Sequence, residues 1–155
     1  MQYVAGSEPV PGCLFCNKAS EEDDIANYVV FRAERCFVML NLYPYNSGHL
    51  MVAPYQHTGD FAELLPEVGT DVFQTAQLAT RVLSDVMHPD GFNLGINQGK
   101  VAGAGVAEHI HLHVVPRWNG DTNFMPVLAD AKVMPELLAA TAEKLRPAFA
   151  QARPS

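Results

Sequence analysis

The sequence predicts an α+β domain with a central antiparallel sheet of about five strands, one long helix and a C-terminal helix. Two observations lead to this prediction. Segments rich in β-branched and aromatic residues come early in the chain with short connections, and they recur after a long segment of helical periodicity. Short connections between consecutive strands favour antiparallel pairing, and helices are then needed to cover the apolar side of the sheet.

The first part of the chain supplies three of the strands. Residues 1–12 contain two glycines and two prolines, so we expect a flexible arm, with the domain itself covering residues 13–150. A polar turn separates the first two strands, and a loop rich in Pro, Asn, Ser and Gly precedes the third. The five predicted strands are residues 27–32, 36–41, 49–53, 92–97 and 109–116.

The long helix is predicted over residues 66–87. Its apolar residues recur at spacings of three and four, which produces a single apolar stripe. The sequence HPDG ends it, because the residue before a proline disfavours helical geometry, and His88 is expected to cap it. A last helix is predicted to begin at Pro135, since proline suits the first helical position, and to run to about Phe149.

Composition limits the classes of function. The chain has 155 residues, enough for one domain with one core, and its net charge of −7 argues against a nucleic-acid partner. A few local donors can still hold an anionic small molecule. No apolar run reaches the ~18 residues that cross a bilayer, and the N-terminus lacks the features of a signal peptide. We therefore expect a cytoplasmic protein with no membrane partner.

The segment HIHLHVV, residues 109–115, is the most informative. Alternation along a strand places His109, His111 and His113 on one face and the apolar residues on the other. Three interpretations follow: separately satisfied histidines, ligands of one catalytic zinc ion, or nucleophilic catalysis. A zinc site of all three is disfavoured, because such ligands spread over ~13 Å while metal–nitrogen bonds are near ~2 Å. A neutral imidazole, in contrast, is a good nucleophile toward phosphorus near neutral pH.

The segment matches the H-φ-H-φ-H-φ-φ motif of the histidine-triad (HIT) superfamily, in which φ is apolar. The resemblance covers roughly residues 13–127. Residues 37–41 and 47–57 resemble the second and third strands of the family, and residues 97–109 (NQGKVAGAGVAEH) resemble its phosphate loop. PRWNGDTNF, after the triad, is similar to a bacterial branch related to diadenosine tetraphosphate phosphorylases and hydrolases.

The resemblance implies roles for individual residues. His111 is implied to be the nucleophile that takes the nucleotidyl group, with His113 bonding the transferred phosphate or the bridging oxygen. Asn41 is implied to contact the ribose hydroxyls, although an Asn there could simply begin a turn. Met39 and Leu42 could line the base pocket or belong to the core.

The phosphate loop is implied to use Asn97, Gln98 and the backbone near Gly105. The loop is no dinucleotide fingerprint, because it precedes a strand and Glu108 replaces the third glycine. Many relatives carry a hydroxyl or amide side chain three to four residues before the first histidine. Gly105 and Val106 stand there, which leaves backbone amides for the phosphate and weakens the case for phosphorylase activity.

Cys13-x-x-Cys16 in a cytosolic chain suggests a metal site rather than a disulfide. The resemblance implies that His57 and His109 complete a structural zinc site. A redox pair and two unrelated thiols are the alternatives. Cys36 is expected to be buried, and His49 is expected to be structural.

The leading hypothesis is an enzyme that hydrolyses or phosphorolyses a nucleoside polyphosphate similar to diadenosine tetraphosphate. It acts at the α-phosphate through a nucleotidyl-histidine intermediate on His111. No organic cofactor is expected, and magnesium is expected only with the substrate. The alternatives are a non-catalytic nucleotide-binding module and a His-ligated zinc hydrolase. The resemblance also implies a homodimer or higher homo-oligomer, with Trp118 and Phe124 as interface candidates.

Overall fold

The computed structural model describes residues 8–121 and 135–152, and in these ranges the chain forms five strands and three α-helices. The strands are β1 (Val29–Arg32), β2 (Cys36–Leu40), β3 (Leu50–Pro54), β4 (Gly91–Ile96) and β5 (Leu112–Arg117). The helices are α1 (Leu14–Ser20), α2 (Pro66–Met87) and α4 (Pro135–Ala152), and the 3-10 turns are η1 (Phe61–Glu63) and η2 (Lys100–Ala102).

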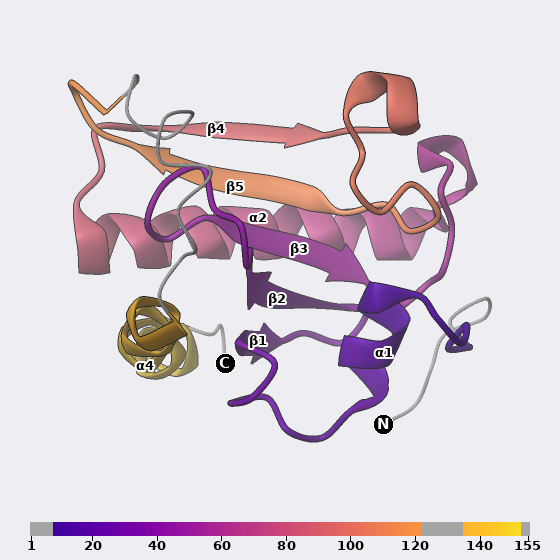
Figure 1. Cartoon of the computed structure of the whole chain (residues 1–155), viewed down its shortest axis with the longest axis horizontal. Helices are drawn as coiled ribbons and strands as arrows, with labels where there is room; N and C mark the ends of the chain where they lie inside the picture. Colours follow the sequence, from indigo (N-terminus) through magenta and orange to yellow (C-terminus); the bar gives the residue numbers. More distant parts are fainter. Residues whose placement is uncertain (1–7, 122–134, 153–155) are drawn as a thin grey trace.

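The strands form one antiparallel sheet in the order β1-β2-β3-β5-β4 (Figure 1). This arrangement confirms the predicted α+β fold. In the register of β5, His113 lies opposite Met51 of β3 on one side and opposite Gly95 of β4 on the other. The strand β5 therefore lies between the edge strand β4 and the strand β3, so that residues from both halves of the chain flank the triad segment.

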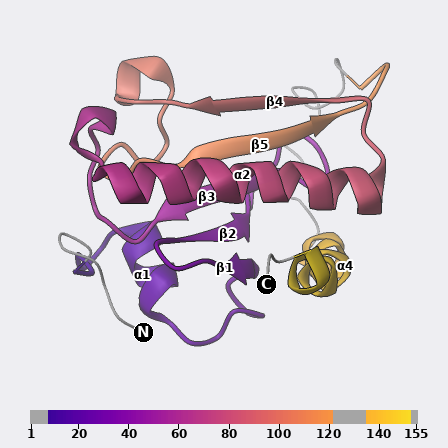
Figure 2. The ribbon, with the colours of Figure 1, turned by 180° about the vertical axis from the view of Figure 1, so that it is seen from behind.

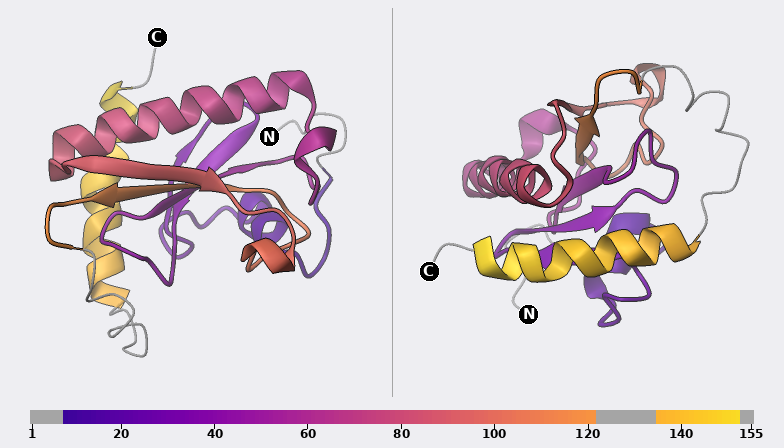
Figure 3. Two further views of the ribbon diagram at one scale, coloured as in Figure 1. Left: turned by 90° about the horizontal axis from the view of Figure 1, so that it is seen from above. Right: turned by 90° about the vertical axis from the view of Figure 1, so that its left-hand side faces the viewer.

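The two faces of the sheet are covered by different helices, as Figure 3 shows from above. Val38 and Leu40 of β2 face a large core with α2 and α4, whereas Phe37 and Met39 alternate to the other face, where α1 lies. Figure 2 shows α2 crossing the back of the sheet. Because α2 fills one face, the short helix and the loops leave room for a binding site on the other.

Helix α2 has the predicted bounds. Pro66 occupies its first turn, and its buried residues form the expected stripe. His88 ends the helix in a left-handed conformation, and its N–H donates to the carbonyl of Ser84. The predicted cap is confirmed, as is the C-terminal helix that begins at Pro135.

Two predicted features differ from the structure. Helix α1, which begins just after the expected N-terminal arm, was not predicted. Its seven residues are too few to show the apolar spacing of a helix. The last strand begins at Leu112 rather than at His109. Its first residues leave the ladder, since the N–H of Ile110 donates to Thr58 and the carbonyl of His109 accepts from the ring of His111.

Residues 8–12 contain no helix or strand, and residues 1–7 of the predicted arm lie outside the described ranges. Cys36 is fully buried in β2, as expected. Within the described residues, no helix has both the length and the apolar character that crossing a membrane demands.

Candidate active site

Three histidines meet on the face of the sheet that α1 covers: His113 in β5, His111 just before β5 and His49 just before β3. The rings of His111 and His113 have centroids 4.8 Å apart, and Nε2 of His49 lies 2.9 Å from Nδ1 of His113. His49 precedes β3, while His113 is in β5, so the sheet pairing brings them together. Phe15 of α1 packs on His111 with a centroid distance of 4.6 Å.

Backbone contacts fix which ring nitrogens carry protons. Nδ1 of His111 lies 2.9 Å from the carbonyl oxygen of His109, which can only accept, so this Nδ1 carries the proton. The lone pair of the neutral ring is then on Nε2. The imidazole of His111 is thus held in the tautomer that a nucleophile needs, through a backbone contact rather than through a carboxylate.

The same reasoning extends through His49 to His113. The N–H of Tyr45 donates to Nδ1 of His49 at 3.2 Å, which leaves the proton of the neutral ring on Nε2. That Nε2–H donates to Nδ1 of His113, so His113 carries its own proton on Nε2. One backbone amide therefore makes His113 a hydrogen-bond donor toward a ligand, next to the free lone pair of His111.

Burial keeps all three rings neutral near pH 7. Desolvation lowers the pKa of His49 to about 3 and the pKa of His113 to about 4, and a neighbouring histidine adds to each shift. Burial also lowers the pKa of His111, although its bond to the carbonyl of His109 opposes the change. A neutral His111 retains the lone pair that nucleophilic attack needs.

His111 and His113 line a cavity of about 360 Å³. Its walls come from α1, β2, β3 and β5, from the loop between β2 and β3 and from the loop between β4 and β5, and they are mostly apolar with a few polar groups. Such a combination suits a small organic ligand that is oriented by a few hydrogen bonds. The predicted base-pocket residues Met39 and Leu42 both lie in this wall.

Besides His113, the structure brings three of the predicted substrate-binding residues to this cavity: Asn41, Asn97 and Gly105. The side-chain oxygen of Asn41 accepts from the N–H of Tyr43. Asn41 therefore both begins a turn and lines the cavity. Gln98 lies elsewhere. Its side chain accepts from the N–H of Phe61 and donates to Asp60, and the structure does not bring it to His111.

Sequence reasoning missed the part that His49 plays. We expected a structural histidine, but its ring is buried and bonded to His113 inside the site. The signal was present, because His49 directly follows a Ser-Gly pair in a segment that resembles the family. Gly48 has φ +82°, a conformation that favours glycine, and this turn delivers His49 to the sheet.

A second cluster lies beside the triad, where the predicted metal ligands Cys13, Cys16, His57 and His109 converge. One possible ligand atom from each residue lies within 4.8 Å of the other three. Among the described residues, these four form the one group of possible metal ligands that is arranged in this way. The distances from Nδ1 of His109 to the two sulfurs are 3.4 and 3.6 Å. The Nδ1 atoms of the two histidines are 3.2 Å apart.

These spacings fit a tetrahedral zinc ion. Bonds of about 2.3 Å to sulfur and about 2.0 Å to nitrogen place tetrahedral ligand atoms roughly 3.3–3.8 Å apart. Nε2 of His109 lies 2.8 Å from the carbonyl of Pro54, which holds Nδ1 toward the cluster. Both cysteines are buried and free of disulfides, and they lie at the start of α1 and inside it.

Comparison with known proteins shows the family of the chain. The HIT domain model matches residues 22–120, and the chain belongs to the HIT domain family. It is 43% identical over 128 residues to the AP-4-A phosphorylase of Mycobacterium tuberculosis (strain ATCC 25618 / H37Rv), covering 83% of this chain. The match spans 66% of that relative, slightly under two thirds of its length.

Two further likenesses bear on the site. The chain is 35% identical to a bis(5'-adenosyl)-triphosphatase from Dictyostelium discoideum over 57% of this chain and 59% of that one. A Zn-bound histidine triad family protein from Mycobacterium smegmatis superposes with a TM-score of 0.74 and 33% identity. That likeness covers 90% of this chain and 94% of the other.

The buried His49–His113 pair predicts a loss of stability in acid. Both pKa values lie below the 6.5 of a free histidine, so on acidification the unfolded chain binds protons first. The free energy of unfolding should fall as the pH drops from about 6.5 toward about 4. Urea unfolding at stepped pH measures this slope.

The variant His113→Gln supplies the comparison, because the Cys/His cluster responds to acid equally in both proteins. We expect the variant to have a shallower slope than the wild type over this pH range. Identical slopes in the two proteins would show that the pair does not titrate in this way.

Proposed function

We propose that this protein cleaves a dinucleoside polyphosphate at its α-phosphate through a nucleotidyl group carried on His111. The observation that supports this most directly is the fixed pair of ring nitrogens at one cavity, an unprotonated Nε2 on His111 and a protonated Nε2 on His113. Two similar proteins are named as a diadenosine tetraphosphate phosphorylase and a bis-adenosyl triphosphatase.

In the proposed reaction, Nε2 of His111 forms a bond to the α-phosphorus while the bond to the bridging oxygen breaks. The leaving nucleoside polyphosphate takes up that electron pair, and the Nε2–H of His113 donates to the departing oxygen. Water then releases the nucleoside monophosphate, or inorganic phosphate releases a nucleoside diphosphate. Splitting the displacement into two steps is the advantage of a covalent intermediate.

Backbone amides are proposed to replace the side-chain phosphate donor that this sequence lacks. Gly105 and Val106 line the cavity, and their N–H groups have no partner among the described residues. The N–H of Gly103, in contrast, is used inside the loop. Fixed N–H donors at this place can stabilise the charge that develops on the phosphoryl oxygens.

Replacing His111 with Asn should reduce turnover by about 10³-fold or more, because no other group supplies the nucleophile. The assay is incubation with diadenosine tetraphosphate, with and without phosphate, followed by product identification. A nucleoside diphosphate that appears only with phosphate indicates a phosphorylase. A monophosphate and a triphosphate without phosphate indicate an asymmetric hydrolase.

Mass spectrometry of a rapidly quenched reaction should place the nucleotidyl group on His111. His88→Asn is the control, since His88 ends α2 away from the cavity, and it should retain full turnover. Turnover near the wild-type rate in His111→Asn, or an adduct on another residue, would rule the mechanism out.

We also propose a structural zinc ion held by Cys13, Cys16, His57 and His109. The support is the convergence of the four ligand atoms, with distances of 3.2–3.6 Å among them in four pairs, and the zinc in a similar protein. Bound there, the ion would fasten α1 to the start of β5. Its effect on the reaction is indirect, since Phe15 and the carbonyl of His109 both hold His111 in place. Reduced cysteines of this kind suit the cytoplasm, our proposed location.

Cys16→Ser should lower the zinc content from one ion per chain and lower the melting temperature. Metal analysis and thermal unfolding measure the two effects. Cys36→Ala is the matched control, because Cys36 is buried outside the cluster, and it should keep its zinc. Full turnover by zinc-free protein that is still folded fits a structural ion. Full zinc content in Cys16→Ser would contradict the proposed ligand set.

A homodimer is proposed through the outer edge of β4 and the apolar groove next to it. β4 ends the sheet, and beside it Phe61, Phe73 and Leu94 are 59, 63 and 55% exposed around a groove of about 660 Å³. Trp118, an interface candidate from the sequence, instead donates to the carbonyl of His88 in its own chain. Phe124 lies outside the described residues.

Phe73→Asp should convert the dimer into a monomer, because a charge in an apolar interface loses its hydration. Light scattering gives the mass directly. Ile25→Asp makes the same kind of change at an exposed position elsewhere and should stay dimeric. A wild-type protein that is monomeric at high concentration would contradict the proposed assembly.

A further inference from the structure

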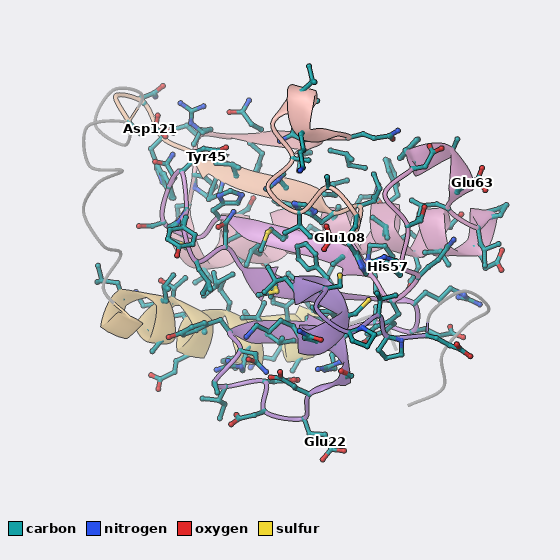
Figure 4. The ribbon with its side chains drawn as sticks, turned by 45° about the vertical axis from the view of Figure 1, so that its right-hand side comes forward. Glu22, Tyr45, His57, Glu63, Glu108 and Asp121 are labelled. Atoms are coloured by element: carbon teal, nitrogen blue, oxygen red, sulfur yellow. The ribbon has the colours of Figure 1, made fainter. Side chains whose placement is uncertain are left out.

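A second cavity adjoins the first at His113. It has a volume of about 470 Å³, and Tyr45, Asn97 and His113 line both cavities. The rest of its wall comes from β4 and the end of β5. Figure 4 shows Tyr45 and Asp121, which both line it, at the same end of the molecule, away from His57. The proposed chemistry at His111 accounts for the first cavity only.

The wall of the second cavity contains a fixed cation. Arg117 donates through Nε and Nη2 to Asp121 and through Nη1 to Asn93, at 2.6–3.1 Å. Asp121 also accepts from the N–H of Trp118 and from Asn46. These bonds use three of the five N–H groups of the guanidinium. The other two have no partner among the described residues and can donate to an anion. The side chain of Arg117 is 35% exposed, and a ligand can reach it.

The wall also contains an aromatic surface. The ring of Tyr45 stacks on His49 with a centroid distance of 5.2 Å and an interplanar angle of 16°, and 62% of Tyr45 is still exposed. The side chain of Leu94 does not add to this surface, because Leu94 lies opposite Val114 and both side chains are on the face of the sheet that α2 covers. An aromatic ring held by stacking offers a flat apolar contact to a base, and the amide of Asn97 lies between the two cavities.

We propose that this cavity binds the distal nucleoside of the substrate, the one that departs with the leaving phosphates. The inference rests on the proposed function. The reacting α-phosphate lies between His111 and His113, and the leaving oxygen is on the His113 side. The phosphate chain then runs past Arg117, and the second base lies against Tyr45. The protein therefore recognises both ends of a dinucleoside polyphosphate.

Gly95 allows a direct test of this binding site. It lies opposite His113 in the sheet register, lines the second cavity, and does not have the left-handed φ that requires glycine. A Cβ built there meets no atom within 4 Å, so Gly95→Val fills cavity space without a backbone clash. Gly91→Val, on the same strand and outside the cavity wall, is the matched control.

The ligands are diadenosine tetraphosphate and adenosine 5′-tetraphosphate, which share the phosphate chain and differ in the second adenosine. Calorimetry in the His111→Asn background prevents turnover. We expect the two-ended ligand to bind about tenfold more tightly or better, because its second end binds in the adjoining cavity. Gly95→Val should bring this ratio close to one, and Gly91→Val should leave it unchanged.

The outcomes separate this inference from the proposed function. A ratio that stays the same in Gly95→Val, or a wild-type ratio near one, overturns the distal binding site even if the adduct on His111 forms. Absence of any adduct overturns the proposed function, whatever the ratio is. Equal loss of affinity for both ligands in Gly95→Val also counts against the inference, because it places the effect at the shared phosphates.

Discussion

His109 connects the two halves of the candidate site, and most of the local geometry depends on it. Its Nδ1 belongs to the Cys/His cluster, its Nε2 contacts the carbonyl of Pro54, and its own carbonyl accepts from the ring of His111. The cluster thus fixes the backbone of one residue, and that backbone fixes the tautomer of the next histidine in the triad. Structural and chemical roles are separated by two positions along the chain.

The helix α1 completes this arrangement from the other side. Phe15 lies between the two cysteines in sequence, and its ring contacts both His109 and His111. A helix of seven residues has little stability of its own, so its position depends on the cluster and on the apolar face that it covers. The proposed metal ligands and the proposed nucleophile are therefore coupled through packing.

The sequence predicted the fold well where local pattern and long-range packing agree. The bounds of α2 followed from its apolar stripe, from Pro66 and from the HPDG stop, each of which acts locally. The start of β5 was wrong because alternation describes side chains, whereas the strand begins where carbonyls become available for the ladder. The carbonyl of His109 is already used by a side chain, and no periodicity reveals that.

The site was predictable in its residue types and less so in its orientations. Asn97 and Gln98 were both expected to face the substrate, yet successive side chains at a strand end point to opposite sides, and only Asn97 lines the cavity. His49 and His113 are 64 positions apart in the sequence, and their contact depends on the pairing of β3 with β5. Such a contact requires the sheet topology, which the motif alone does not supply.

The low pKa of His113 has a consequence for how the proposed site would hold a phosphate. Because this ring and its neighbours are uncharged near neutral pH, they would hold the α-phosphate through hydrogen bonds rather than ion pairs. A phosphate at His111 and His113 is then not retained by a positive charge on these rings. In the proposed binding mode, the dependence of affinity on ionic strength should therefore come from Arg117 rather than from the histidines.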